Sequence, residues 1–503
     1  MSGPAIRWLR GLGGGLLLGL LAACDRDGST AAATDGGLPP PGPARPVEIA
    51  APIEKQLANG LRVIVLPRAG SALVAAEFMV LAGGEADPAD RAGLADFTAS
   101  LLAKGTRSAT GSRSASELAA AAEALGGSIR ADAGWDASRI GITVTTARLA
   151  AALDLLADLV RRPAFATDEV ERYRAQAIDG LRLSFSDPGE LAPLVAARLV
   201  HGRGPYGHPR LGTPTSVQRI TAEELRSLHR RLYRPDQAVL VLAGGLDPDT
   251  GFALAAQVFG DWTASREPRP PFTVAIEAPP EGSPEVTVID QPDAGQAAVI
   301  ALLPLPPRSD AGYYDGLVAS SVLGGGYSSR LNREIRIKRG LSYSAGADYG
   351  VLRNGGAWLA SAQTKNASAA EVVGLMHREL ARLSAEPVPA EELAARKASY
   401  VGGYARRLET AAGIASLIAS RVAQGLPADE IGRVIGAVDA VQPAPLQHWA
   451  AAHFKPTRLR YVIVGDARQF LAALRRDGRS VEVIPIAELD LESPSLRRVP
   501  PKP

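Results

Sequence analysis

The residue types that most often bind catalytic metals are few and scattered in this chain. Two histidines four residues apart would place both imidazoles on one face of a helix, and no pair among the six histidines has that spacing. His448 and His453 lie five residues apart, on different helical faces. A surface or hydrogen-bonded core role explains each histidine better than metal binding does. We therefore expect no zinc site from this set, which comprises His201, His208, His229, His377, His448 and His453.

A second group of residues that could do chemistry lies further along the chain, where Arg336 is followed seven residues later by Tyr343. Arginine offers a fixed fork of donors and tyrosine one phenolic donor, which suits a carbonyl oxygen or a developing oxyanion. The same residues also fit a basic surface helix followed by a strand whose tyrosine packs in the core, and composition alone favours that simpler interpretation. The run Gly324–Gly326 lacks a following Gly-Lys-Ser/Thr and predicts no phosphate loop. No Gly-x-Ser-x-Gly elbow and no free cysteine nucleophile supports another hydrolase mechanism.

The overall composition is that of a globular protein. Of the 503 residues, 46% are hydrophobic and 21% are charged. A chain of this length has room for roughly two to four cores. The 55 basic and 53 acidic residues give a net charge of +2 without a polybasic block. The charge distribution therefore predicts no nucleic-acid partner.

The first 24 residues have the pattern of an export signal. Arg7 and Arg10 precede an apolar run, Leu12 to Leu21, that is shorter than the ~20 residues of a membrane-spanning helix. The tetrapeptide Leu-Ala-Ala-Cys that ends at Cys24 resembles a bacterial lipobox. This implies that Cys24, the only cysteine, is lipidated and anchors the chain at the periplasmic face of the cell envelope. Asp25 resembles the residue that retains lipoproteins in the inner membrane. A plain secretory signal is the alternative.

Two seams divide the rest of the chain. Residues 25–48 are rich in Gly, Pro, Ala, Ser and Asp and predict a flexible linker. A second Pro-rich seam, 266–284, separates residues 49–265 from residues 285–490, and a tail of residues 491–503 follows. Strands alternate with long helices in both parts, and the order of the predicted elements repeats. The sequence therefore predicts an internal tandem duplication.

Short-range signals predict the individual elements. Asn59-Gly60 indicates a hairpin. The spacing of Leu94, Phe97 and Leu101 with Leu102 predicts an amphipathic helix whose other face carries Asp96 and Ser100. Further strands are predicted at 61–66, 73–81, 140–144, 286–289, 297–303, 342–349 and 357–363, and further helices at 118–125, 149–160, 313–323 and 369–383.

Several longer motifs resemble one known family. Residues 93–106 read Gly-Leu-Ala-Asp-Phe-Thr-Ala-Ser-Leu-Leu-Ala-Lys-Gly-Thr, and further signatures lie at Pro205–Thr213, Tyr233–Asp236 and Gly325–Leu331. Together they resemble the pitrilysin/insulinase-type zinc peptidases and mitochondrial processing peptidases. The resemblance implies an α+β fold, in which two similar halves arise by tandem duplication. Each half would be a mainly antiparallel sheet with helices packed on one face, and the halves would close like a clamshell over a peptide.

In that family the helix at residues 93–106 reads His-x-x-Glu-His. The two histidines bind Zn²⁺ and the glutamate activates a zinc-bound water. Here those positions hold Asp96, Ala99 and Ser100. The family's third ligand, a later glutamate, falls on Gly180, and the adjacent Asp179 is rotated by about 100° around the helix. The resemblance therefore implies a degenerate zinc site, and we expect no cofactor on this chain.

The resemblance also gives Arg336 and Tyr343 the role of a substrate-binding pair. Keeping this pair without the zinc ligands resembles the division of labour in heterodimeric family members. The leading hypothesis is a non-catalytic subunit of a periplasmic zinc endopeptidase that binds peptide or unfolded-protein substrate beside a homologous, zinc-bearing partner. The alternative is a stand-alone peptide-binding or chaperone-like protein that captures extended segments by strand addition. Residues Arg130–Ala133 depart from the family's Asn-Ala-x-Thr, so substrate contact there would be lost or altered.

Overall fold

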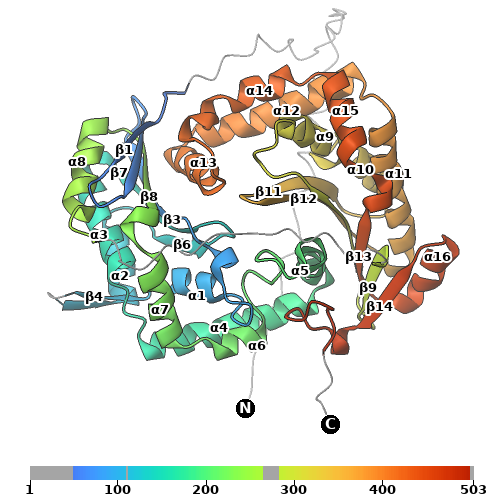
Figure 1. The fold of residues 1–503 in the computed structure, drawn as a ribbon, viewed down its shortest axis with the longest axis horizontal. Coiled ribbons are helices and arrows are strands. Elements are labelled where there is room, and N and C mark those ends of the chain that lie inside the picture. The colour runs from blue at the N-terminus through green and yellow to red at the C-terminus, as the bar shows by residue number, and fades with distance from the viewer. Residues whose placement is uncertain (1–48, 109–110, 264–282, 499–503) are drawn as a thin grey trace, which may run out of the picture. The chain divides into compact units, whose positions relative to one another are not determined.

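The computed structural model describes residues 49–108, 111–263 and 283–498 (Figure 1). Residues 49–263 are termed the first half and residues 283–498 the second half. The predicted signal peptide with Cys24, the linker 25–48 with Asp25, and nearly all of the seam 266–284 lie outside the described residues. The last five residues of the tail also lie outside them. The expectations for these segments remain predictions.

The first half is built on one sheet with the strand order β1-β2-β8-β3-β7-β6. Neighbouring strands run antiparallel, except that β2 and β8 are parallel. The predicted hairpin joins β1 to β2, and Gly60 adopts a φ of 94° there, which glycine tolerates without strain. The strands are β1 (Ile53–Gln56), β2 (Arg62–Pro67), β3 (Leu73–Val80), β6 (Arg130–Ala133), β7 (Ser138–Thr145) and β8 (Ala238–Gly244).

Some helices of the first half pack on one face of this sheet. Leu94, Phe97 and Leu101 are buried against it, as their helical spacing predicts. A two-stranded hairpin, β4 (Gly105–Ser108) with β5 (Gly111–Ser114), lies apart from the sheet. The helices are α1 (Leu94–Leu101), α2 (Ala115–Ala124), α3 (Leu149–Arg161), α4 (Thr167–Ser186), α5 (Pro188–His201), α6 (Pro214–Arg219), α7 (Ala222–Leu232) and α8 (Pro248–Phe259).

The second half repeats this plan with the strand order β11-β12-β10-β13-β9-β14. Its strands are β9 (Val286–Asp290), β10 (Ala297–Leu305), β11 (Ala345–Leu352), β12 (Gly355–Thr364), β13 (Arg460–Gly465) and β14 (Val481–Pro485). Its helices are α9 (Tyr313–Gly324), α10 (Arg330–Asn332), α11 (Ala369–Ala385), α12 (Ala390–Leu408), α13 (Ala411–Ala423), α14 (Val434–Ala440), α15 (Pro443–His453) and α16 (Leu471–Arg476).

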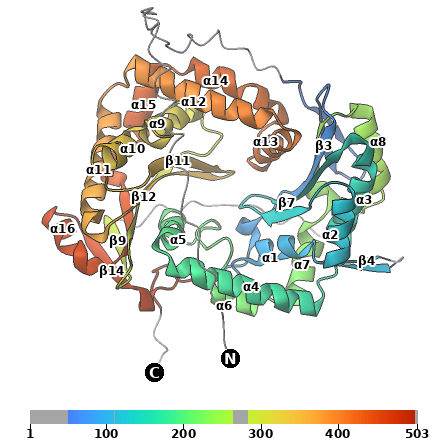
Figure 2. The same cartoon turned by 180° about the vertical axis from the view of Figure 1, so that it is seen from behind.

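Three neighbouring strands in each sheet pair with one another in the same register. In the first half β7 lies between β3 and β6, and Ala75–Glu77 of β3 pair with Gly141–Thr143 of β7. In the second half β12 lies between β10 and β11, and Ala298–Ile300 of β10 pair with Ser361–Gln363 of β12. All of these pairs are antiparallel. Figure 2 shows β3 and β7 of the first half and β11 and β12 of the second. The predicted α+β fold with two similar halves is confirmed.

Each half also contributes one helix to the sheet of the other half, which the sequence did not predict. Helix α13 packs against β3 and β8, and α5 packs against β10 and β13. Ile414 and Ile418 of α13 therefore share one apolar cluster with Ile64 and Met79 of the first sheet. Burying these faces removes apolar surface from water and joins the two halves.

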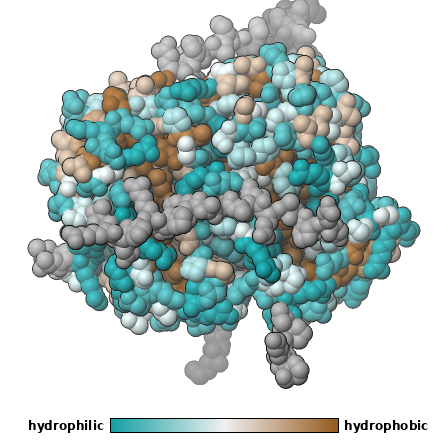
Figure 3. All heavy atoms as spheres, in the orientation of Figure 1, coloured by the Kyte–Doolittle hydropathy of each residue, from teal (hydrophilic) through white to brown (hydrophobic). Residues whose placement is uncertain are grey.

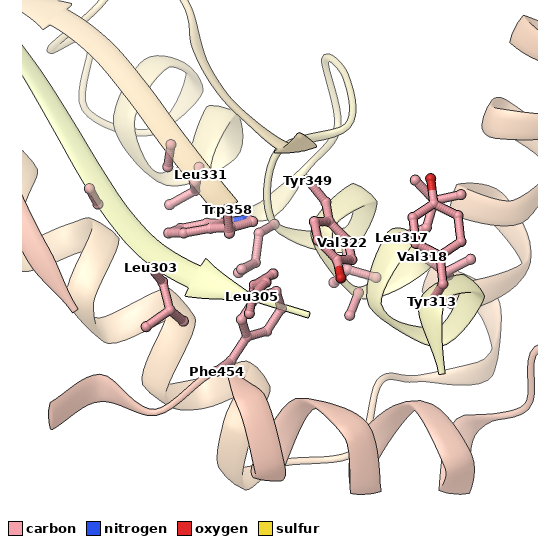
Figure 4. Packing of buried hydrophobic residues seen from close by; sticks show 14 of the residues in the cluster. Leu303, Leu305, Tyr313, Leu317, Val318, Val322, Leu331, Tyr349, Trp358 and Phe454 are labelled. Carbon is pink, nitrogen blue, oxygen red and sulfur yellow. The ribbon is translucent and has the colours of Figure 1, made fainter. Parts of the chain in front are cut away.

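Apolar packing in the second half centres on β12. Figure 4 shows Trp358, Leu303 and Phe454 among the buried residues of this apolar cluster. Trp358 is fully buried, and the ring centroids of Trp358 and Phe454 are 5.7 Å apart. Polar side chains dominate the face drawn in Figure 3, with apolar patches between them. Within the described residues, no helix has both the length and the hydrophobicity needed to cross a bilayer.

One predicted strand begins later than expected. The sequence predicts a strand from residue 342, whereas β11 begins at Ala345. Ser342 Oγ donates to Ser344 O (2.6 Å) and accepts from Ser344 N (3.2 Å). These local bonds compete with the sheet ladder, so residues 342–344 form a loop.

A buried polar cluster links the β11–β12 turn to the first half. Arg353 N donates to Asp136 Oδ2 (2.9 Å), and Arg353 Nη2 donates to Asp136 O (2.7 Å). Tyr206 OH donates to Asp136 Oδ1 (2.5 Å). Arg353 Nη1 lies 3.9 Å from Glu85 Oε1, which has no hydrogen-bond partner among the described residues. The cluster therefore contains one incompletely satisfied buried carboxylate.

Replacing Glu85 by glutamine should stabilise the protein at alkaline pH. Burial, with a smaller contribution from the charge of Asp136, raises the pKa of Glu85 from its ordinary value of about 4.5 to about 8. Between these two values the folded protein binds more protons than the unfolded chain, so the free energy of unfolding falls as the pH rises. Glutamine does not ionise, so the variant does not lose this stability as the pH rises. We expect the variant to be more stable near pH 8 by on the order of 2–4 kcal/mol and unchanged near pH 4.

Urea unfolding of Glu85→Gln and the wild-type chain across this pH range measures the effect. Glu123→Gln on α2 is the control, because the side chain of Glu123 is exposed. Equal stabilities of Glu85→Gln and the wild-type chain near pH 8 would show that Glu85 ionises there without cost.

Candidate functional site

The helix at the degenerate zinc motif is α1, and its polar positions are already engaged. Asp96 Oδ1 accepts a hydrogen bond from Arg210 Nη1 at 3.0 Å, and the same nitrogen donates to Ala133 O. Burial raises the pKa of Asp96, with Arg210 acting in the opposite direction. A guanidinium therefore neutralises the one carboxylate at these positions. Ala99 is fully buried and carries no donor or acceptor on its side chain.

The position of the third ligand is equally unsuited to a metal. Gly180 lies on α4 at an exposed position, and a Cβ built there would meet no atom within 4 Å. The adjacent Asp179 is exposed and pairs with Arg182 at 3.3 Å. Tyr173, about two turns before Gly180 on α4, hydrogen-bonds Ser100, and burial raises the pKa of its phenol. The side chains at these positions do not fit zinc.

The histidines do not replace the missing ligands. His208 Nε2 lies 3.0 Å from Gly84 O, His229 Nε2 lies 2.7 Å from Val160 O, and His377 Nδ1 lies 3.1 Å from Tyr461 OH. Burial lowers the pKa of His201 and of His229 to about 4, so both rings are neutral at pH 7. Across the described ranges, no three His, Cys, Asp or Glu side chains gather as a metal site would require.

Arg336 and Tyr343 line one open cavity of about 640 Å³ in the second half. This second-half cavity is bounded by the N-terminal end of α5, the middle of β10, the end of β12 and the loop before β11. Its wall also includes Tyr327 and Asn332. Tyr343 is 86% exposed, which excludes the simpler interpretation that it packs in the core. Both predicted residues thus face the same space.

The local fold sets the position of Arg336. Residues Arg333–Ile337 form a π-helical turn, closed by a hydrogen bond from Lys338 N to Arg333 O at 2.9 Å. Such wide turns occur often at functional sites. Arg336 Cζ lies 5.1 Å from the ring centroid of Tyr327 and 4.8 Å from that of Tyr343. Tyr327 lies within the signature at Gly325–Leu331, but the sequence alone assigns it no role at this site.

The glycine run brings helix α9 close to strand β11. At Gly324, the last residue of α9, a Cβ would lie 1.8 Å from Ala347 N. Only glycine allows this approach without displacement. Gly326 adopts a φ of 136°, which also favours glycine. The glycine run therefore allows close packing of α9 on β11 and so shapes the cavity wall.

A cavity of about 650 Å³ occupies the matching place in the first half. Ala75–Glu77 and Gly141–Thr143 line it, as Ala298–Ile300 and Ser361–Gln363 line the second-half cavity. A helix from the other half completes each wall through its second and sixth residues. These are Ala412 and Ser416 of α13 in the first-half cavity, and Gly189 and Pro193 of α5 in the second-half cavity. The two cavities are thus structural counterparts within the duplication.

The side chains of the two cavities differ. The first-half cavity contains Glu77, Arg130, Asp132 and Arg139, and Arg139 Nη1 lies 3.5 Å from Glu77 Oε1. When the two sheets are aligned by their paired strands, Gly127 before β6 corresponds to Tyr343 before β11. A Cβ at Gly127 would lie 2.7 Å from Thr143 O, so this position excludes a tyrosine. An arginine–tyrosine pair is therefore confined to the second-half cavity.

Both cavities adjoin an edge strand. β6 ends the first sheet and β11 ends the second, so each has one side unpaired within the described residues. An extended peptide can add to such an edge through main-chain hydrogen bonds. The altered sequence Arg130–Ala133 forms β6 itself, so its backbone stays able to pair whatever its side chains are.

Two stretches of the sequence match models of one peptidase family. Residues 62–182 match the family model described as insulinase (peptidase family M16), and residues 219–400 match the model described as peptidase M16 inactive domain. An uncharacterized zinc protease of Mycobacterium leprae is 32% identical over 356 residues, which cover 70% of this chain and 78% of that protein.

Solved structures share the fold. A peptidase M16 inactive domain from Pseudomonas fluorescens has a TM-score of 0.75 at 23% identity, covering 82% of this chain and 98% of that one. A chain of complex III2 from Candida albicans has a TM-score of 0.69 at 16% identity, covering 86% of this chain and 100% of that one. The sequence matches, with the duplicated fold, show that this chain belongs to the insulinase family of peptidases (M16).

Proposed function

We propose that this chain is the non-catalytic, substrate-binding subunit of a heteromeric zinc endopeptidase. One observation carries the proposal: Arg336 and Tyr343 line an open cavity, whereas Asp96, Ala99, Ser100 and Gly180 offer no ligand set. The zinc and its general base would then belong to a homologous partner chain. Arg336 and Tyr343 would hold the peptide backbone and donate to the oxyanion that forms on the scissile carbonyl.

The cellular setting of the proposal comes from the sequence. The lipobox-like segment ending at Cys24 supports a lipid anchor at the periplasmic face of the envelope, with Asp25 favouring the inner membrane. The neighbouring fold in complex III2 of Candida albicans supports assembly, because there such a chain is part of a larger complex. No nucleic-acid partner is proposed.

A second candidate function is a stand-alone peptide-binding protein of chaperone type. The unpaired edges of β6 and β11 favour it, since strand addition needs neither zinc nor a partner chain. The two candidates differ in what accompanies the chain when it is isolated. Affinity purification from solubilised native membranes, with mass spectrometry and a zinc assay, should recover a stoichiometric zinc-bearing relative if the first proposal is correct. Metal-free, inert protein recovered alone would instead favour the second.

Within the purified complex, Arg336→Ala should lower kcat/KM for a quenched peptide by about 10²-fold, because a donor to the developing oxyanion is lost. Tyr343→Phe, which removes only the hydroxyl, should act in the same direction. The complex should stay assembled by gel filtration in both variants. Arg130→Ala, in the first-half cavity, is the matched control and should leave kcat unchanged. Wild-type rates in both Arg336→Ala and Tyr343→Phe would refute the substrate-binding role.

A further inference from the structure

Arg336 is a cation without an anion among the described residues. Its guanidinium lies over the rings of Tyr327 and Tyr343 and forms no hydrogen bond or salt bridge with the described residues. Two neighbouring basic residues share the carboxylate of Glu334. Lys338 Nζ lies 2.6 Å from Glu334 Oε1, and Arg339 Nη1 lies 2.7 Å from Glu334 Oε2. The fork of Arg336 therefore keeps its donors for a ligand.

The surroundings of Arg336 add positive charge without balancing it. Among the described residues, Arg336 is the only charged one in the wall of the second-half cavity. Behind the glycine run, the buried Arg396 donates to Ser328 Oγ and to Gly325 O (3.5 Å), and forms no ion pair within the described ranges. Arg330 nearby is neutralised by Glu392 at 2.7 Å. A cavity with charges of one sign concentrates ligands of the opposite sign.

The first-half cavity gives an internal comparison. It has the same strand register and nearly the same volume, but it combines two acidic with two basic side chains. Glu77 lies where the second half has Ile300, and Asp132 pairs across the sheet with Arg139. Acidic side chains in this wall repel an anion. The excess positive charge is therefore a property of the second-half cavity and not of the shared fold.

We infer that the second-half cavity binds a carboxylate of an extended peptide, with Arg336 as its receptor. The inference rests on the proposed function, because it takes the cavity to be a peptide site and specifies the peptide's chemistry. A guanidinium fork can donate two parallel hydrogen bonds to a carboxylate, a stronger contact than one to a neutral carbonyl. The carboxylate belongs either to an aspartate or glutamate side chain or to the C-terminus of the peptide.

Fluorescence anisotropy of the full solubilised chain with four labelled peptides of one extended sequence tests this. Three peptides have an amidated C-terminus and carry Glu, Gln or Lys at the central position. The fourth carries Gln and a free C-terminal carboxylate. We expect at least one of the two extra carboxylates to tighten binding about tenfold over the amidated Gln and Lys peptides. Preference for the Glu peptide assigns the side chain, and preference for the free C-terminus assigns the terminal carboxylate.

Two variants and a salt series complete the design. Arg336→Gln should abolish the preference, whereas Arg130→Gln in the first-half cavity should retain it. Added salt should weaken the preferred peptide most, because exposed charges are screened. If all four peptides bind equally but binding still requires Arg336, the carboxylate inference is overturned and the peptide-binding proposal stands. If none of the peptides binds, alone or in the purified complex, both are overturned.

Discussion

Replacing Arg353 by methionine should lower the free energy of unfolding by about 3–5 kcal/mol, because two hydrogen bonds from a charged donor are lost and each is worth roughly 1.5–3 kcal/mol. Arg353 Nη2 donates to Asp136 O in the first half (2.7 Å), and Nε donates to Ala423 O at the end of α13 (2.9 Å). Methionine keeps much of the apolar stem but none of these donors. The backbone bond from residue 353 to Asp136 Oδ2 can persist, so the change isolates the guanidinium.

The loss should be concentrated where the two halves meet. Hydrogen exchange is expected to accelerate at the C-terminal end of α13 and at residues 84–86, which lie beside the guanidinium. Urea unfolding gives the free energy. Arg107→Met in the β4–β5 hairpin is the matched control, because the side chain of Arg107 is exposed. Equal midpoints for the two variants would show that Arg353 does not hold the halves together.

The sequence predicts the local elements of this fold well because their signals are local. Helix α11 and strand β10 follow from apolar periodicity, and the hairpin before β2 follows from Asn59-Gly60. The start of β11 is predicted three residues early, because Ser342 forms side-chain bonds that hydropathy does not report. The packing of one helix from each half on the sheet of the other half could not be predicted. Nothing in α5 or α13 alone indicates which of two similar sheets it will cover.

Some features of the candidate site can also be predicted from the sequence, whereas others are seen only in the fold. Residue types suffice to predict that Ala99 and Gly180 cannot bind zinc, and the structure adds that Arg210 neutralises Asp96. Spacing singles out Arg336 and Tyr343, but only the fold shows that Tyr327 completes their environment. The cluster of Arg353 with Asp136 joins residues 217 positions apart, a separation that single-sequence patterns do not reach.

Gly324→Ala is expected to damage the candidate site without touching its polar side chains. The new Cβ would lie 1.8 Å from Ala347 N and 2.4 Å from Ala347 Cβ, so α9 and β11 must separate. Such overpacking against backbone costs about 1–3 kcal/mol or more. Both elements bound the loop that carries Arg336 and Tyr343, so their separation should shift the two side chains relative to each other.

Gly350→Ala provides the matched control for this change. Gly350 lies on the same strand β11, but its Cβ would make only ordinary contacts, 3.8 Å from Ala357 O and 4.0 Å from Asp348 Oδ2. Peptide affinity and the urea midpoint should both fall in Gly324→Ala and stay near wild type in Gly350→Ala. Wild-type affinity in a destabilised Gly324→Ala protein would mean that the Arg336–Tyr343 geometry does not depend on the α9–β11 contact. Because the glycine run contributes no side chain to the ligand, lost affinity here would show that the cavity acts through its shape as well as through its charge.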